Sequence, residues 1–419
     1  MVKIKILHFI QNKAALRAHL TFSDTEEITN YYIIPLGTKN QVLIHSENKF
    51  FYKNNSTSGL ETYCEDTMEL IKKLEPDALI VAQANICGAY QAYFKSKIKK
   101  IYYIHHGFWS MTQINAKIHE NAFFDNYLIF DKVFMMKRNA EALKKVSDKF
   151  YTINGIPQID YMKSVDLEQK KKLIHKFPKK KSILLVTNNK ANSLKEYINI
   201  LSVLVRFAKK YNYHVYTKIK KSPSTKATYL ASFRKANLMH RNSSITIIAD
   251  DSLLYDYFFC DVVVIQTMGT SLIESLILDK PTILCQLINH TDYMDIKKYP
   301  IIPQANNVRE LVRYLEIFRK YPTYCKRTNF QKERMAFLME NVGDINANSV
   351  EEISKMILKD FQILEKRRLK DLMKKEKEKR KQMEIQKQKK KEMEKQKAKE
   401  REKKIKIRKI RKIKIIKNK

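Results

Sequence analysis

Five residues that can bind a charged or hydroxylated ligand lie between an apolar run and an amphipathic helix pattern. Thr267, Gly269, Thr270 and Ser271 form a small-residue turn at the expected start of that helix, and Glu274 follows Thr270 by about one helical turn. The backbone N–H groups and the partial positive charge of a helix start attract phosphate. We therefore expect phosphate on this turn and sugar or ribose hydroxyls on Glu274. The alternative is a strand–helix joint that needs small residues for structural reasons alone.

Two adjacent histidines, His105 and His106, offer acid–base chemistry. They precede Gly107 at the expected end of an apolar strand, and ligands of open α/β sheets bind at this edge. A histidine there can act as a general base on an acceptor hydroxyl, and the neighbouring Trp109 can stack on a sugar or a base. His106 is the preferred base and His105 the substitute. A single histidine is more often structural, so the position at the strand end carries this prediction.

Other polar residues follow other expected strands. Lys218 ends the strand expected at residues 214–218 and brings positive charge toward the same edge. Gly155 and Pro157 shape a tight turn that leads to Asp160. We expect this turn to face the ligand cleft; the alternative is a turn that only ends the first domain. The sequence shows no pair of aspartates in a metal-binding context, which favours chemistry without a metal.

Strand patterns that alternate with helix patterns predict an α/β fold with two parallel, doubly wound, Rossmann-like sheets. We expect the first domain at residues 1–165, a linker at 166–181, the second domain at 182–345, a closing helix at 346–365, and a basic, helix-leaning tail at 366–419. The expected strands are residues 4–10, 31–35, 78–82, 101–104, 127–130 and 149–153 in the first domain, and 182–187, 214–218, 245–248, 262–265 and 282–285 in the second.

Composition limits the class of protein. The chain has 419 residues and a formal net charge of +37, which indicates an anionic partner such as a phosphate-bearing substrate, a membrane face or nucleic acid. Its five cysteines have no CxxC spacing, so we expect a reducing compartment and no disulfide frame. We find no signal-peptide pattern and no run of roughly 18 apolar residues. A cytoplasmic protein is expected.

The tail holds half of the excess charge, with 28 Lys and Arg against 9 Asp and Glu in residues 361–419. Its isolated Met and Ile residues keep no heptad, so we expect no coiled-coil seam. Residues 403–417 add regular isoleucines to the basic residues, and such a stretch can rest on the inner face of an anionic membrane at roughly 1 kcal/mol per basic residue. A solvated, disordered lysine tail is the alternative, and nucleic acid is not an expected partner.

The order of these motifs resembles the GT-B transferases, and within them the CDP-glycerol glycerophosphotransferases of teichoic-acid and capsule synthesis. The resemblance covers roughly residues 100–300. It implies that His106 is the acceptor base and that Thr267, Thr270 and Ser271 bind the phosphates of the donor. The sequence departs from the family where a Lys-x-His-Pro motif is replaced by Lys218-Ile-Lys220, and the turn followed by a helix glutamate is more similar to nucleotide-sugar users of the same fold. The donor is therefore open.

From the motifs and the resemblance, we predict a transferase that moves a glycosyl or glycerophosphoryl group from a nucleotide-sugar or CDP-glycerol donor to a surface-polymer or lipid-linked acceptor. No cofactor and no metal are expected. Two alternatives stay open. A nucleotide-sugar epimerase shares the double-Rossmann fold but needs several carboxylates in the cleft, of which only Glu274 and Asp160 are placed. A non-enzymatic binding protein would use the tail, but it has no aromatic–basic RNA-binding motif in its favour.

Overall fold

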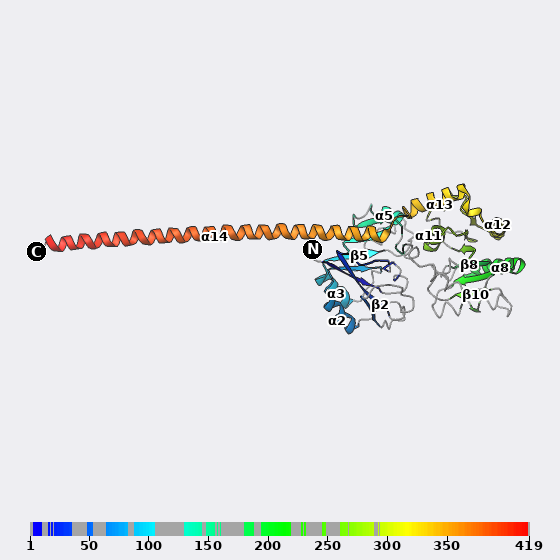
Figure 1. Cartoon of the computed structure of the whole chain (residues 1–419), viewed down its shortest axis with the longest axis horizontal. Coiled ribbons are helices and arrows are strands. Elements are labelled where there is room, and N and C mark those ends of the chain that lie inside the picture. The colour runs from blue at the N-terminus through cyan, green and yellow to red at the C-terminus, as the bar shows by residue number, and fades with distance from the viewer. Residues whose placement is uncertain are drawn as a thin grey trace. The chain divides into compact units, whose positions relative to one another are not determined.

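The structure is a computed structural model of the whole chain, shown in Figure 1. It describes residues 3–10, 16, 18–19, 21–35, 48–52, 64–82, 88–104, 130–144, 148–155, 157, 160, 180–187, 194–218, 228, 230–231, 245–248, 260–266, 268–288, 292 and 294–417. These residues form two parallel sheets with helices between the strands, and a long C-terminal helix.

The first sheet has seven strands in the order β3-β2-β1-β4-β5-β6-β7, with every pair parallel. The order reverses between β1 and β4, as in a doubly wound fold. Its strands are β1 (Ile4–Phe9), β2 (Ile28–Pro35), β3 (Lys49–Tyr52), β4 (Ala78–Val81), β5 (Lys100–Ile104), β6 (Lys132–Met136) and β7 (Phe150–Ile153), and its described helices are α2 (Glu65–Leu74), α3 (Gly88–Lys97) and α5 (Lys137–Lys144).

The second sheet has six parallel strands in the order β10-β9-β8-β11-β12-β13, with its reversal between β8 and β11. Its strands are β8 (Ser182–Val186), β9 (His214–Lys218), β10 (Ile245–Ile248), β11 (Val262–Ile265), β12 (Thr282–Cys285) and β13 (Gln304–Ala305). Its helices are α8 (Leu194–Tyr211), α11 (Thr270–Ile277), η3 (Ile296–Lys298), α12 (Val308–Lys320), η4 (Tyr324–Lys326) and α13 (Thr328–Asn341).

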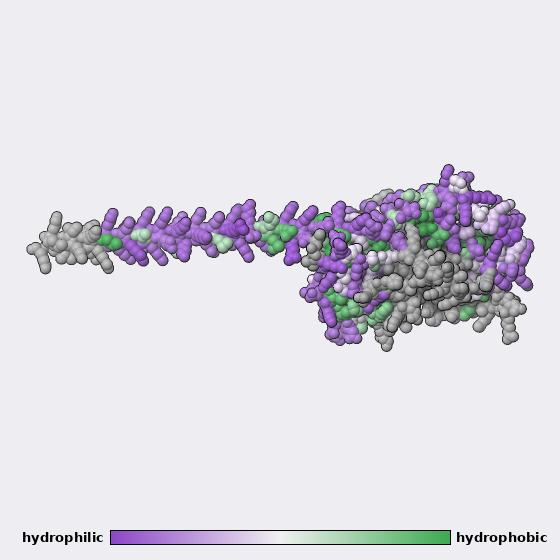
Figure 2. All heavy atoms as spheres, in the orientation of Figure 1, coloured by the Kyte–Doolittle hydropathy of each residue, from purple (hydrophilic) through white to green (hydrophobic). Residues whose placement is uncertain are grey.

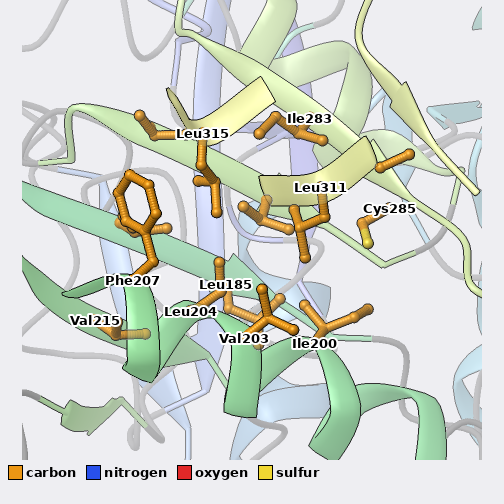
Figure 3. Packing of buried hydrophobic residues seen from close by; sticks show 14 of the residues in the cluster. Leu185, Ile200, Val203, Leu204, Phe207, Val215, Ile283, Cys285, Leu311 and Leu315 are labelled. Atoms are coloured by element: carbon orange, nitrogen blue, oxygen red, sulfur yellow. The ribbon is translucent and has the colours of Figure 1, made fainter. Parts of the chain in front are cut away.

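The core of the second domain explains why these segments form these elements. Strand β11 is a continuous Val-Val-Val-Ile run that is buried along its length, as expected for a parallel strand covered on both faces. Helix α8 turns a stripe at Tyr197, Ile200, Leu201 and Leu204 toward the sheet, which is helical spacing. Figure 3 shows Ile200 and Leu204 of α8 in the same packed cluster as Leu185 and Ile283 of the sheet. Leu311 and Leu315 of α12 belong to this cluster too.

Three strands differ from the prediction. A strand was predicted at residues 127–130, of which only Phe130 is described, and the strand of this region is β6 at Lys132–Met136. The charged residues Asp131 and Lys132 at the start of this strand interrupt the apolar pattern that would predict it. In the structure, the side chains of Asp131 and Lys100 form an ion pair at 2.6 Å. Strands β3 and β13 were not predicted, because both are short edge strands that lack a long apolar run.

The predicted linker at residues 166–181 lies almost wholly outside the described residues, and the domain boundaries stay predictions. Contacts between the segments that carry the two sheets are clear. Arg138 of α5 pairs with Asp295 at 2.7 Å and with Glu340 of α13 at 3.3 Å, and the hydroxyl of Tyr299 donates to Glu340 at 2.5 Å. These bonds attach α5 to the end of α13.

The chain divides into two compact units, Met1–Ile353 and Ser354–Lys419. Helix α14 runs without a break from Ser349 to Lys417, through the boundary expected at residues 365–366. Val350 and Ile353, in the first turns of this helix, belong to the first unit and are buried. Among the described residues, none of the helices has a stretch apolar and long enough to cross a membrane.

Candidate functional site

The carboxyl ends of the strands in the second sheet line up at one edge. Lys218 of β9 pairs with Val186 of β8, and Val186 pairs with Ile265 of β11, so three strand ends form one row across the reversal point. With neighbouring strands about 4.8 Å apart, the row spans about 10 Å. Helices α8 and α11 begin after β8 and β11 at this edge, where open α/β sheets bind their ligands.

The start of α11 is the predicted phosphate turn. Gly269 is the N-cap residue and makes no side-chain capping bond, while its carbonyl accepts from the N–H of Leu272 at 3.1 Å. Thr270 and Ser271 are the first two helical residues. The first N–H groups of any helix have no partner within the helix itself. A helix start is a common place for an anion, and anion binding at this one stays a prediction. Thr267 lies outside the described residues.

The backbone conformation of Gly269 does not require a glycine. Its φ of 168° is extended backbone that any residue adopts. A Cβ added at this position would meet no heavy atom of the described residues within 4 Å. Neither strain nor packing within the described chain therefore excludes a side chain here. Glycine leaves open space beside the start of this helix. Such space allows a ligand to approach the backbone closely.

Two acidic side chains are buried in the part of the chain that the structure describes, and both belong to the helices that start at this edge. Glu274 of α11 is 6% exposed and Glu196 of α8 is 1% exposed. Burial of a carboxylate is costly unless it has partners. Glu274 lies one turn into α11. Its role in accepting hydrogen bonds from sugar or ribose hydroxyls stays a prediction. Glu196 was not predicted.

Glu196 ties three elements together beneath the edge. One carboxylate oxygen accepts from the side-chain amide of Gln266, directly after β11, at 2.9 Å, and the other accepts from the backbone N–H of Ile288, beyond β12, at 3.0 Å. Gln266 is fully buried. Burial, together with the charges of Glu196 and Glu310, raises the pKa of the Cys285 thiol on β12. A glutamate in the first turn of a helix is common, so its sequence position alone gave no signal.

Lys218 is buried at the end of β9, with 8% of its surface exposed. The hydroxyl of Thr187, directly after β8, donates to the Lys218 carbonyl at 3.1 Å. This bond ties the ends of the two strands together. The structure thus brings Lys218 to the same edge as the α11 start, as predicted, although its role toward a ligand stays a prediction.

The predicted cleft turn makes its described contacts with the start of α14. The N–H of Asn154 donates to Glu352 at 3.0 Å. The Asp160 carboxylate accepts from the Ser349 hydroxyl and, at 3.3 Å, from the N–H of Val350. Gly155 has a φ of 82° and Pro157 is buried. This turn anchors a helix start, and its ligand role stays a prediction.

Comparisons with known proteins give structures but no sequence family. No protein-family model and no curated protein matches the sequence. The UDP-GlcNAc 2-epimerase from Neisseria meningitidis bound to UDP-GlcNAc is similar with a TM-score of 0.58 at 17% identity, over 85% of this chain and 100% of that chain. The UDP-N-acetylglucosamine 2-epimerase from Rickettsia bellii gives 0.58 at 15% identity, over 85% and 96%. A glycosyltransferase from Rickettsia africae ESF-5 gives 0.50 at 14%, over 86% and 99%.

Two parallel Rossmann-like sheets and these likenesses decide the fold. The chain has the GT-B fold. The predicted fold class is confirmed, including a helical C-terminal segment, whereas the CDP-glycerol family is not among the similar structures named above.

The predicted bases of this GT-B chain, His105 and His106, lie outside the described residues, directly after Ile104 of β5. Within the described ranges, no group of three or more His, Cys, Asp or Glu could hold a metal ion. Chemistry without a metal or cofactor stays a prediction.

A second histidine pair, which was not predicted, lies buried in the first domain. His8 of β1 has its Nδ1 at 3.0 Å from Nδ1 of His19 and its Nε2 at 2.9 Å from Oδ1 of Asn30. The Asn30 amide nitrogen donates to the Ser23 carbonyl at 2.9 Å, which fixes the amide orientation. Oδ1 then accepts, so His8 carries its proton on Nε2. Burial lowers the pKa of His8 from 6.5 to about 4, against the opposing Asn30 bond and the Asp24 charge.

Proposed function

We propose that the chain is a nucleotide-sugar enzyme whose second domain binds the nucleotide diphosphate at the start of α11. The observation that carries this proposal is the unfilled space at Gly269 beside a helix start, on the row of strand ends that includes Lys218. The helix start and the lysine would neutralise the phosphates. Glu274, one turn further, would accept from ribose or sugar hydroxyls.

We propose 2-epimerisation of a UDP-N-acetylhexosamine as the reaction. Support comes from the similar structures, of which one is a UDP-GlcNAc 2-epimerase bound to UDP-GlcNAc and a second, from Methanocaldococcus jannaschii, is in complex with UDP-GlcNAc and UDP at a TM-score of 0.53. Inversion at C2 requires that a proton leave that carbon and another return to the opposite face. This chemistry needs acid–base groups near the sugar, and His106 and His105 are the candidates from the sequence.

Transfer of a glycosyl or glycerophosphoryl group to a polymer or lipid-linked acceptor is the second candidate. It is supported by the likeness to the Rickettsia africae glycosyltransferase and by the histidine pair that follows β5. In this reaction His106 would take the proton of the acceptor hydroxyl. The two reactions differ in one requirement, because epimerisation needs no acceptor.

The binding site is tested at Gly269. Calorimetric titration with UDP, CDP and GDP would name the base, and Gly269→Ala and Gly269→Val would then be compared with the unchanged chain. Gly269→Ala should nearly keep the melting temperature of the free protein, because the added Cβ meets no heavy atom of the described residues within 4 Å. The melting temperature of Gly269→Val checks that this variant is folded. Affinity for the selected nucleotide should fall with side-chain size, at least tenfold for valine. Full affinity in Gly269→Val would refute the site.

The reaction is tested by proton NMR of UDP-GlcNAc incubated with the protein alone. Growth of the resonances of the C2 epimer, without release of UDP, would establish epimerisation. Release of UDP only after addition of a lipid-linked or polymeric acceptor would establish transfer and contradict epimerisation. His106→Ala should abolish either reaction while leaving nucleotide affinity unchanged; loss of both would contradict its assigned role.

A further inference from the structure

The second compact unit presents a basic surface without tertiary cover. Every residue from Glu365 to Ile407 is exposed on helix α14. Residues 361–419 contain 28 Lys and Arg against 9 Asp and Glu. Figure 2 shows the described part of this helix as a mostly hydrophilic surface with isolated apolar side chains. A helix that is polar all round bridges domains through solvent, is stabilised by many i,i+4 pairs, or is not stable by itself.

Pairing within the helix leaves most of this charge uncompensated. Between Glu365 and Ile407, the structure gives one ion pair, between Arg380 and Glu376 at 3.2 Å, and both of its side chains are more than 60% exposed. Such pairs contribute little to stability. Lysines four residues apart, such as Lys366 and Lys370, repel each other along the helix. An anionic surface would remove this repulsion, so a partner of this helix would have to be anionic.

The exposed apolar side chains indicate what kind of anionic surface fits. Leu369 is 54% exposed, Met373 70%, Met383 56% and Ile405 55%. They do not form a seam for a second helix, because Ile407 lies about 160° around the helix from Ile405. A lipid interface accepts basic side chains at its headgroups and scattered apolar side chains below them.

Nucleic acid fits these residues less well. No aromatic residue follows Phe361, so the segment offers no platform on which bases can stack. A phosphate backbone would also leave the leucine, methionine and isoleucine side chains in water. Residues 403–417 are the most basic part of the chain. They also contain isoleucines interspersed among the lysines and arginines.

We propose that residues 366–417 of α14 dock on an anionic lipid bilayer. Basic side chains attract the anionic headgroups, and the apolar side chains on the helix face that meets the bilayer, such as Ile405, enter the interface. This contact concerns the second unit and is independent of nucleotide binding in the first. It would hold a nucleotide-using domain beside a membrane.

The test is flotation of the full-length protein with vesicles of phosphatidylcholine alone and of phosphatidylcholine with 30% phosphatidylglycerol. We expect binding to the anionic vesicles only, weakened by salt. The variant Ile405→Ser/Ile407→Ser/Ile410→Ser/Ile413→Ser keeps the charge and should bind at least tenfold more weakly. A matched control, Gln382→Ser/Gln386→Ser/Gln388→Ser/Gln396→Ser, should bind as the unchanged chain does.

Three results would overturn the proposal. The first is absence of binding to the anionic vesicles. The second is unchanged binding of the isoleucine variant, which would show attraction by charge without contact with the lipid interface. The third is tighter binding of a nucleic-acid duplex than of anionic vesicles at the same salt, measured by fluorescence anisotropy, which would name nucleic acid as the partner. Circular dichroism of each variant checks that α14 stays helical.

Discussion

At the scale of single residues, the buried carboxylate of Glu196 has the clearest structural purpose. It joins α8 to the segment after β11 and to the segment after β12, and the segment after β11 leads into the Gly269 turn. The positions of the α8 and α11 starts at the sheet edge thus depend on one side chain. Hydrogen bonds to a charged group contribute about 1.5–3 kcal/mol each, so this group is also important for stability.

We predict that Glu196→Gln lowers the free energy of unfolding by about 2 kcal/mol, because an amide can no longer accept from both Gln266 and Ile288. The double variant Glu196→Gln/Gln266→Glu restores a donor and an acceptor for the hydrogen bond between positions 196 and 266. It should recover most of the lost free energy of unfolding. Urea denaturation measures both effects. A double variant as unstable as the sum of its single variants would show that the two side chains do not interact.

The buried histidine pair predicts a pH dependence of stability. The pKa of folded His8 lies near 4, against 6.5 for an exposed histidine. Between pH 4 and pH 6.5 the unfolded chain therefore binds more protons at His8 than the folded chain does. The contribution of neutral His8 to the free energy of unfolding is complete above about pH 6.5 and is lost as the pH falls toward 4. The full difference amounts to about 3 kcal/mol.

Denaturation of the unchanged chain and of His8→Gln at several pH values between 7 and 4.5 checks this prediction. The difference in unfolding free energy between the two should shrink steadily as pH falls, since glutamine does not titrate. A constant difference across this range would contradict a neutral, buried His8.

Residue types reveal a site from sequence when they break a pattern. Gly269, Thr270 and Ser271 interrupt an apolar strand and an apolar helix, so the turn could be placed from sequence alone. Glu196 fits the polar side of an amphipathic helix pattern and gave no sign that its carboxylate is buried. Burial depends on what packs against α8, here Gln266 and the chain near Ile288, and these lie 70 or more residues away.

At the scale of elements, the start of α14 depends on a close contact between two turns. Gly343 has a φ of 91°, and a Cβ there would lie 2.6 Å from Oδ1 of Asn154. That oxygen accepts from the N–H of Asp344 at 3.3 Å. Gly155, with a φ of 82°, has more room, since its nearest neighbour would be the Ala347 carbonyl at 3.6 Å.

We therefore predict that Gly155→Ala destabilises the chain by about 1–2 kcal/mol through backbone strain. Gly343→Ala should cost about 1 kcal/mol more, because Asn154 must also move and lose a hydrogen bond. Thermal unfolding of both variants gives the comparison. In an Asn154→Ala background the two glycine substitutions should become nearly equal; a persistent difference would place the additional strain elsewhere.

Long buried elements could be predicted from sequence and short edge elements could not. Strand β11 is four apolar residues that face protein on both sides, and its pattern is sufficient to identify it. Strands β3 and β13 lie at sheet edges, where one side of the strand has no neighbour to impose a pattern. Strand β6 was shifted in the prediction because Lys132 begins it.

At the scale of the whole molecule, the two α/β series specify the GT-B fold through local alternation of strands and helices. The similar structures share 14–17% identity with the chain, so the fold tolerates nearly complete replacement of side chains. The fold could therefore be predicted more fully than the chemistry, because the predicted bases His105 and His106 lie in a segment without strong periodicity, outside the described residues.

The stability of the second unit should depend on salt concentration, whereas that of the buried strands in the first unit should not. Buried strands of the first unit depend on packing, whereas residues 366–407 of α14 depend on local helix energetics alone. Excess lysines repel along this helix, and repulsion reaches about 30 Å at 10 mM salt but only a few ångströms at several hundred millimolar. We predict that amide hydrogen exchange in residues 366–407 slows several-fold between about 10 and 300 mM NaCl, as screening removes the repulsion.

Hydrogen exchange followed by mass spectrometry measures both units in one sample, with the strands β8 and β11 as an internal reference that should not change. Faster exchange of α14 at higher salt would mean that attraction between glutamates and lysines outweighs repulsion between lysines. The helix would then be held by its own ion pairs rather than weakened by its net charge. Addition of anionic vesicles at low salt should slow exchange in the same residues, because the bilayer supplies the neutralising charge that salt otherwise provides.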